Sequence, residues 1–197
     1  MLTSEQAQTV VLNQVNNPNR QCTDDELFVV SYCRLSPRKD FWVISANSKA
    51  YIIDGDQSKC YVGVGAYLVD VESGDLTIVG SGQSLNDYFQ DMYDDRTANG
   101  KVYLLRSGYN SLPKAEVITL KNLLGCDLKE SRELLIGSSK DWVYGKNRVL
   151  VKFQNYLIDK GIKTEITLSK ETKNAIELKD LWFIQKMIER LKERLNA

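Results

Sequence analysis

The chain has 197 residues, enough for one domain with a substantial core or for two small domains. Hydrophobic residues make up 43% and charged residues 26%, which is typical of globular proteins and argues against disorder. The formal net charge is zero and there is no histidine, so Ser-His-Asp and Cys-His catalytic devices are excluded.

No apolar run approaches the roughly 20 residues that a membrane span needs. The first residues, MLTSEQAQ, have neither the basic nor the apolar segment of a signal peptide. We therefore expect a cytoplasmic protein without a membrane partner.

Charge is divided between the halves of the chain. Residues 1–100 carry fourteen acidic and seven basic side chains, a net charge of −7, whereas residues 101–197 carry twelve and nineteen, a net charge of +7. Such asymmetry indicates two units that have different partners or attract each other. The polar stretch 95–100, which ends in glycine, is the expected junction.

The first half begins with a predicted helix that Thr3 or Ser4 can cap. Its apolar face is Ala7, Val10, Val11 and Val15, and the Asn/Pro-rich stretch 16–19 ends it. Short strand-like runs follow at 26–33, 41–45, 51–53, 60–64, 66–71 and 76–79. The sequence Glu-Ser-Gly-Asp at 72–75 is typical of a hairpin turn. With a last helix from Ser84 to about residue 93, residues 1–96 form an expected α+β domain.

The last helix of this half interleaves acids and tyrosines. Asp87, Asp91 and Asp94 share one helix face, and Leu85, Phe89 and Met92 face inward. The acidic face and its edge comprise Asp87, Tyr88, Asp91, Tyr93, Asp94 and Asp95. These residues are candidates for binding a basic cleft of a partner protein. The alternative is an ordinary solvated helix face.

Several runs in this half carry a family resemblance. They are Asn-Ser-Lys-Ala-Tyr at 47–51, Gly-Asp at 55–56, Gly-Ala-Tyr-Leu-Val-Asp at 65–70, Gly74, Gly-Ser-Gly at 80–82, and Ser84 with Tyr88. Together they resemble the immunity protein 35 family over about residues 4–93. That resemblance implies a small bacterial domain that binds and blocks a cognate toxin, and it transfers no catalytic residue.

The second half begins with a predicted strand at 101–108, followed by a helix whose apolar stripe is Val117, Leu120 and Leu124. Gly125 suits the helix end, and Asp127 with Glu130 has the spacing of a capping box. In the second helix we expect Leu128 and Leu135 to point inward, with the small Ser131 between them.

A loop with Trp142 and Tyr144 comes next in the prediction. A third helix follows over about 147–160, with Leu150, Phe153 and Leu157 inward, and then a strand at 162–168. The expected order of this domain is strand, three helices, strand.

Residues 125–135, Gly-Cys-Asp-Leu-Lys-Glu-Ser-Arg-Glu-Leu-Leu, and the later Lys160-Gly161 carry a second resemblance. They resemble the C-terminal domain of the bacterial ribosomal stalk protein, over about residues 101–168. That family binds translational GTPases through basic residues of its first two helices, which implies a role for Lys121, Lys129 and Arg132.

The chain departs from the stalk family at two positions. Ile118 stands where the family has a lysine, and Asp127 replaces a second turn glycine. The stalk's dimerisation domain and alanine-rich hinge are also missing, so we do not interpret the chain as a ribosomal protein. A plain solvated surface is the alternative reading of the three cations.

The tail, residues 169–197, contains a heptad-like series of apolar residues. Its members are Leu181, Ile184, Ile188, Leu191 and Leu195, broadened by Trp182, Phe183 and Met187. The preferred prediction is a helix that packs on its own chain; dimerisation and toxin contact are the alternatives. Acids alternate with its basic residues, so no direct nucleic-acid binding is expected.

The sequence contains few candidates for catalytic or metal-binding residues. Cys22, Cys33, Cys60 and Cys126 form no CxxC pair, and we expect free thiols, no metal and no cofactor. The carboxylate pairs Asp24/Asp25 and Asp54/Asp56 lie in turns, where aspartate is expected for backbone reasons.

The resemblance of residues 4–93 to an immunity family implies a non-enzymatic immunity protein that neutralises a secreted antibacterial toxin. A toxin acting on the translation machinery, such as an ADP-ribosyltransferase, would fit the stalk-like domain. The alternative is a binding module or chaperone-like factor that docks on ribosomes or translation factors without a toxin.

Overall fold

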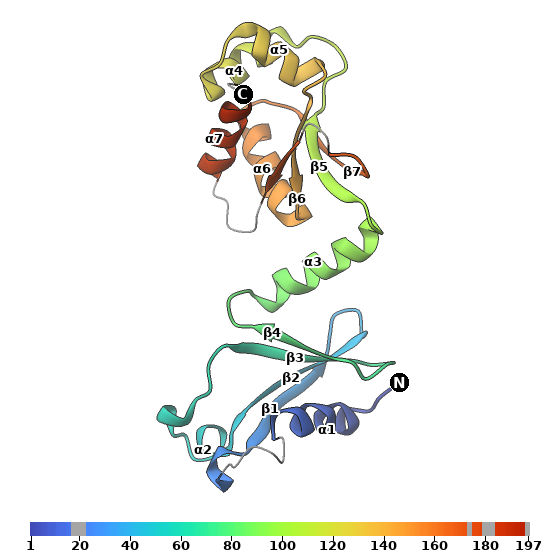
Figure 1. The fold of residues 1–197 in the computed structure, drawn as a ribbon, viewed down its shortest axis with the longest axis vertical. Helices are drawn as coiled ribbons and strands as arrows, with labels where there is room; N and C mark the ends of the chain where they lie inside the picture. The colour runs from blue at the N-terminus through green and yellow to red at the C-terminus, as the bar shows by residue number, and fades with distance from the viewer. Residues whose placement is uncertain (17–22, 173–174, 179–183, 196–197) are drawn as a thin grey trace. The chain divides into compact units, whose positions relative to one another are not determined.

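The computed structural model describes residues 1–16, 23–172, 175–178 and 184–195 (Figure 1). It has an α+β fold with two four-stranded sheets among these residues. The chain forms two compact units, Met1–Tyr88 and Phe89–Ala197. This division falls inside helix α3 (Leu85–Ala98), N-terminal to the stretch 95–100 where the sequence suggested a junction.

The first unit is an antiparallel meander with the strand order β1-β2-β3-β4. Its strands are β1 (Phe28–Leu35), β2 (Phe41–Ser48), β3 (Val64–Asp70) and β4 (Leu76–Gly80). The predicted hairpin between β3 and β4 is confirmed, with Tyr67 opposite Ile78 and Val69 opposite Leu76.

Helix α1 (Ser4–Val15) packs on one face of this sheet (Figure 1). Thr3 caps it in a capping box with Gln6, as one of the two predicted capping residues. Ala7 and Val11 are fully buried against a sheet face that carries Ile44, Tyr67 and Val69. The sheet side also holds the helix start, because Trp42 Nε1 donates to the Leu2 carbonyl oxygen at 3.0 Å.

Two strand predictions for this unit, at residues 51–53 and 60–64, are wrong. Residues 51–53 belong mainly to a short helix, α2 (Lys49–Ile52), because Ser48 Oγ accepts from the Tyr51 amide and caps a helical turn. Residues 60–63 form no strand and connect the 3₁₀ turn η2 (Gln57–Lys59) to β3. A first 3₁₀ turn, η1 (Asp24–Glu26), precedes β1. Asp56 begins η2 by accepting from the Ser58 amide.

The second sheet has the strand order β7-β5-β6-β8, with β8 parallel to β6 and the other pairs antiparallel. Its strands are β5 (Val102–Ser107), β6 (Asp141–Gly145), β7 (Thr164–Ser169) and β8 (Ile176–Leu178). The accompanying helices are α4 (Lys114–Leu124), α5 (Leu128–Ile136), α6 (Asn147–Asp159) and α7 (Ile184–Leu195).

Strand β6 corrects the predicted strand–three helices–strand order. Trp142 and Tyr144 were predicted to lie in a loop, whereas both lie in a strand that pairs with β5 and β8. The strand is only five residues long, so its alternation is too short to stand out in the sequence. The Trp142 side chain is fully buried, as expected for a residue of a strand that has a neighbour on each side.

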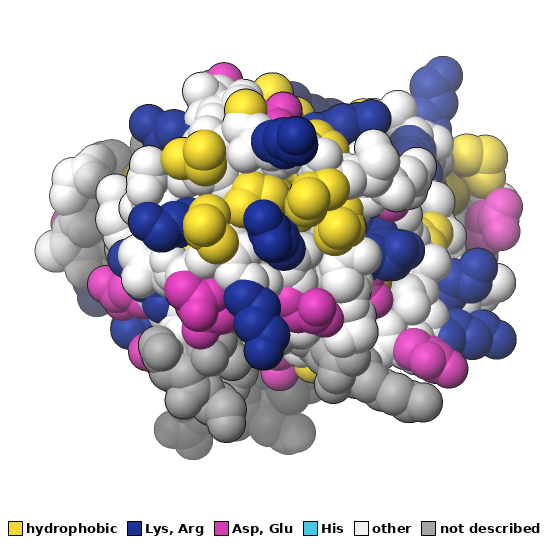
Figure 2. Space-filling view, turned by 90° about the horizontal axis from the view of Figure 1, so that it is seen from above, with side chains coloured by type: hydrophobic (Ala, Val, Ile, Leu, Met, Phe, Trp, Pro, Cys, Tyr) yellow, Lys and Arg dark blue, Asp and Glu magenta, His cyan; other side chains and the backbone are white. Residues whose placement is uncertain are grey.

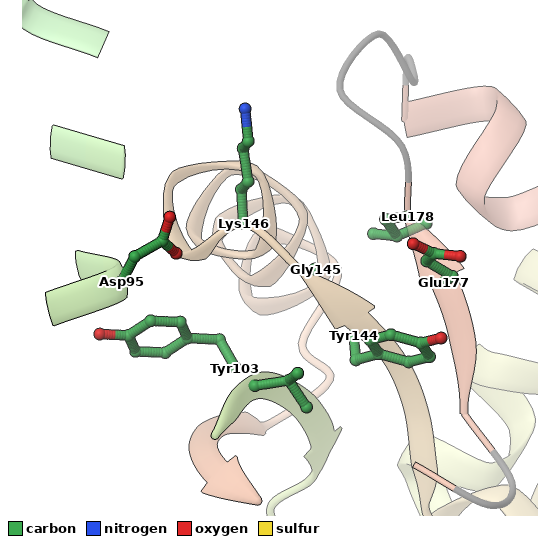
Figure 3. A pocket seen from close by; sticks show the side chains of 8 residues that line it. Asp95, Tyr103, Tyr144, Gly145, Lys146, Glu177 and Leu178 are labelled. Carbon is green, nitrogen blue, oxygen red and sulfur yellow. The ribbon is translucent and has the colours of Figure 1, made fainter. Parts of the chain in front are cut away.

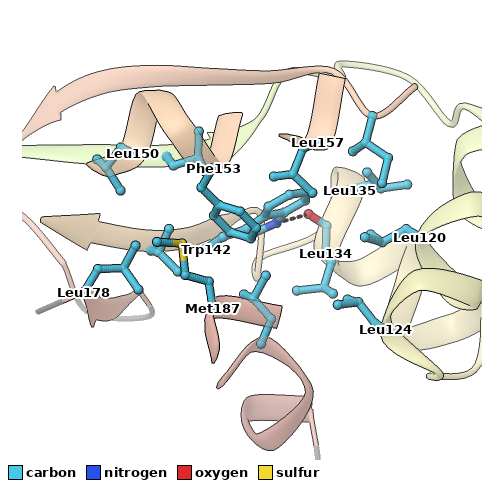
Figure 4. Packing of buried hydrophobic residues seen from close by; sticks show 14 of the residues in the cluster. Leu120, Leu124, Leu134, Leu135, Trp142, Leu150, Phe153, Leu157, Leu178 and Met187 are labelled. Carbon is cyan, nitrogen blue, oxygen red and sulfur yellow. Dashed lines mark hydrogen bonds between the residues drawn. The ribbon is translucent and has the colours of Figure 1, made fainter. Parts of the chain in front are cut away.

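The core of this unit contains the buried apolar side chains of α4, α5 and α6 (Figure 4). Val117, Leu120, Leu124, Leu135, Leu150, Phe153 and Leu157 are buried, as predicted. Met187 and Leu191 of α7 join the same cluster, so the prediction that the tail helix packs on its own chain is confirmed. Leu181, Trp182 and Phe183, which were predicted to extend that seam, lie outside the described residues.

None of the described helices combines the length and apolar character that crossing a membrane requires.

Replacing Leu191 by alanine should destabilise the second unit by about 2–5 kcal/mol, the usual cost of truncating a buried leucine. Amide hydrogen exchange at Leu120 and Phe153, followed by NMR, measures this loss. Gln185→Ala, at an exposed position of the same helix, is the matched control. A loss that grew with protein concentration would contradict packing within one chain and indicate a dimer.

Candidate functional site

A groove between α4 and α5 is an apolar surface feature of the second unit. Its volume is about 250 Å³, and its lining residues come from both helices and the segment before α4. They are Leu112, Lys114, Val117, Ile118, Leu128 and Arg132. We refer to these six residues as the α4–α5 groove.

The turn between the two helices sets up this groove. Gly125 ends α4 with φ 65°, the left-handed conformation that glycine adopts without steric cost. Asp127 then starts α5 in the predicted capping box, accepting from the Glu130 amide while the Glu130 carboxylate accepts from the Asp127 amide. Local sequence therefore fixes the end of α4 and the start of α5.

The groove exposes large aliphatic side chains. Ile118 is 55% exposed and Leu128 is 45% exposed, so the prediction that Leu128 points inward is wrong. The first turn of α5 extends past the core, which Leu134 and Leu135 fill instead. In Figure 2, hydrophobic side chains gather on the viewed face of the second unit, with lysine and arginine side chains among them.

Two cations line the groove, and only one was predicted. Arg132 projects from α5, and Lys114 from the first turn of α4. Lys121 is half-buried and Lys129 is exposed, and neither belongs to the lining. Lys114 lies four residues before Ile118, one helical turn away; that spacing is the signal that could have pointed to it.

Two acidic residues of α3 that were predicted to bind a partner protein make contacts within the chain instead. Asp91 is buried, with Lys146 Nζ at 3.0 Å from Oδ2 and Arg148 Nε at 2.6 Å from Oδ1. Asp94 accepts a hydrogen bond from Asn147 Nδ2 at 3.1 Å. The expectation of an exposed acidic face is therefore wrong at Asp91, because this carboxylate is used within the chain.

This arrangement, which we call the Asp91 clamp, joins α3 to the start of α6. The N-cap residue of α6, Lys146, offers no side-chain cap, and negative charge near a helix N-terminus is stabilising. Burial opposes ionisation of Asp91, but the hydrogen bonds from Arg148 and Lys146 outweigh it and lower its pKa.

The remaining residues of the predicted acidic surface are divided. Tyr93 is buried and stacks on Phe89, with the ring centroids 5.9 Å apart. Asp87, Tyr88 and Asp94 are half-buried, and Asp95 is exposed. Asp91 and Tyr93 thus do not lie on an accessible acidic surface with Asp95.

The carboxylate pairs weighed as acid–base candidates have local structural partners. Asp24 forms an ion pair with Lys49. Asp56 caps the η2 turn, and the hydrogen bonds from Ser58 lower its pKa. Cys33, Cys60 and Cys126 are free thiols, and Cys22 lies outside the described residues. Over residues 1–16, 23–172, 175–178 and 184–195, no group of three or more acidic or cysteine side chains is placed to hold a metal ion.

No protein-family model, curated protein or solved structure matches the chain. The α4–α5 groove, with exposed aliphatic side chains beside two cations, is a feature that a functional proposal can use.

Replacing Asp91 by asparagine should lower the free energy of unfolding of the second unit by about 1–3 kcal/mol at neutral pH, since charge-assisted hydrogen bonds are lost. Because the folded-state pKa is lowered, the contribution is present above pH of about 4 and is lost as the pH falls through the folded-state pKa. The difference between wild type and variant should therefore shrink in acid.

Urea unfolding at neutral and acidic pH, followed through the NMR signals of Leu150 and Phe153, measures both effects. Asp95→Asn removes the same charge from an exposed position of α3 and should change stability by less than about 0.5 kcal/mol. Equal effects of the two substitutions would contradict the clamp.

Proposed function

We propose that the chain is a non-enzymatic immunity protein that binds a cognate antibacterial toxin and that the α4–α5 groove is one of its contact surfaces. The observation that carries the proposal is the exposure of Ile118 and Leu128 beside Arg132 and Lys114. The resemblance of residues 4–93 to an immunity family supports the choice of a toxin as the partner.

The groove has the chemistry of a protein contact. Exposed aliphatic side chains next to a concave surface gain free energy when a partner removes them from water. The groove volume of about 250 Å³ is below the range of about 300–1,000 Å³ that is typical of small-molecule pockets, which favours protein side chains as occupants. Arg132 and Lys114 beside it favour a partner whose contact has an acidic rim.

The resemblance of the second unit to the stalk domain suggests how binding to the toxin would inhibit it. Its resemblance implies a surface that translation factors recognise, so a toxin that attacks the translation machinery would meet a similar surface on this chain. Occupation of the target-binding face of the toxin would then block it in the cytoplasm. An ADP-ribosyltransferase that modifies a translation factor is one toxin class of this kind.

A second candidate is a binding module that docks on a translation factor or the ribosome without any toxin. It is favoured by Arg132, one of the three cations that the stalk resemblance implies, because this residue lines the groove. Under this alternative the chain binds a translational GTPase when no toxin is present.

Co-expression with the toxin encoded beside its gene tests the proposal. The chain should restore growth of the host and co-purify with the toxin in a one-to-one complex. The proposal fails if growth is not restored and the toxin binds no better than to an unrelated acidic protein. Binding to an elongation factor in the absence of toxin would support the second candidate instead.

The double substitution Ile118→Ser/Leu128→Ser should weaken toxin binding at least tenfold, because it removes the exposed apolar contact while the core stays intact. Isothermal titration calorimetry with the purified toxin measures the change. Ile158→Ser/Val151→Ser removes comparable exposed aliphatic side chains from α6 and should leave affinity within twofold. A similar loss in both variants would show that the groove is not the contact.

A further inference from the structure

A second concave site of the Phe89–Ala197 unit lies at the end of strand β6, apart from the α4–α5 groove. This pocket has a volume of about 470 Å³, within the range of ligand-binding pockets. Its lining comes from α3, β5, β6, β8 and the first residue after β6 (Figure 3). The lining residues are Asp95, Val102, Tyr103, Tyr144, Gly145, Lys146, Glu177 and Leu178, and we call it the β6 pocket.

Strand β8 builds one wall of the β6 pocket. Tyr144 and Glu177 are register partners on adjacent strands, so their side chains lie next to each other on one sheet face. This close pairing needs a glycine at the next position: a Cβ on Gly145 would lie 2.8 Å from the Leu178 carbonyl oxygen. The wall therefore depends on a specific backbone fit.

The opposite wall is held in place as well. Tyr103 donates its hydroxyl hydrogen to the Asp94 carbonyl oxygen at 3.0 Å, which fixes its ring beside Asp95. Figure 3 shows Asp95 near the Tyr103 ring on one side, and Glu177 near the Tyr144 ring on the other. Two aromatic rings and two carboxylates thus flank the pocket.

The electrostatic character of the β6 pocket is negative. Burial raises the pKa of Tyr103, and the negative charges of Asp94 and Asp95 raise it further. The carboxylates of Asp95 and Glu177 have no ion-pair partner within the part of the chain that the structure describes. Both residues are exposed to solvent and open to a ligand.

Lys146 is the one cation among the lining residues, and it faces Asp91, whose single carboxylate it shares with Arg148. Its Nζ lies 3.0 Å from Asp91 Oδ2 in the Asp91 clamp. In Figure 3 its side chain extends away from the Tyr103 and Tyr144 rings. The lining therefore carries two carboxylates and one lysine, and the lysine is directed toward Asp91 and away from the two rings.

We propose that the β6 pocket binds an arginine-containing basic segment of a partner protein. A guanidinium is planar, weakly hydrated and able to stack on tyrosine rings while it donates to a carboxylate. The pocket is larger than one guanidinium group, and its carboxylates stand on two different walls. Two neighbouring basic side chains of one segment therefore match it better than a single ion.

This inference rests on the proposed function only for the identity of the protein that carries the segment. It adds a second contact surface to the same unit, with the opposite charge preference to the α4–α5 groove. A short peptide tests it without any toxin, so its failure would leave the neutralisation experiment unaffected.

The probe is the capped dipeptide acetyl-Arg-Arg-amide, titrated into the ¹⁵N-labelled full chain at 150 mM salt. Saturable shifts should appear at the amides of Val102, Gly145 and Glu177. The citrulline dipeptide, which has nearly the same shape without the charge, should bind at least fivefold more weakly. Equal shifts from both peptides, or shifts scattered over all acidic surfaces, would overturn the proposal.

The variant Asp95→Asn/Glu177→Gln should weaken arginine-dipeptide binding at least fivefold. Asp159→Asn/Glu72→Gln removes two exposed carboxylates elsewhere and changes the net charge equally, so it should stay within twofold of wild type. The same spectra report whether each variant is folded. A matching loss in this control would reduce the effect to general electrostatics and refute the site.

Discussion

The packing of the second unit depends on hydrogen bonds between the sheet and the C-terminal end of helix α5. The last carbonyl groups of a helix have no partner within the helix. Here Trp142 Nε1 on β6 donates to the Leu134 carbonyl oxygen at 2.8 Å (Figure 4). Ser107 Oγ on β5 donates to the Leu135 carbonyl oxygen. Two side chains of neighbouring strands thereby fix both the position and the rotation of α5.

This rotation decides what the surface offers. With the carbonyls of residues 134 and 135 held by the sheet, the Leu134 and Leu135 side chains fill the core. Leu128 and Arg132, earlier on the helix, are left facing outward beside α4. The α4–α5 groove therefore depends on core packing as well as on the turn at Gly125, and its apolar character comes from Ile118 and Leu128, which stay exposed.

Local signals made much of this fold predictable from the sequence. Gly125 and the Asp127–Glu130 capping box marked the helix turn, and Thr3 marked the start of α1, because caps act over three or four residues. Strand β6 was missed because five residues are too few for a period. The Asp91 clamp joins positions more than fifty residues apart, which no local pattern reveals.

The two sheets differ in how far apart along the chain their contacts lie. The β1-β2-β3-β4 meander pairs only neighbouring strands. Unit two pairs β5 with β7 and β6 with β8, and completes its core with Met187 and Leu191. Loop-closure entropy favours early formation of the local pairings. During synthesis the meander can therefore fold first, while the second unit must await β8 and α7. The groove and the β6 pocket would mature last, after the first unit has already become a folded body.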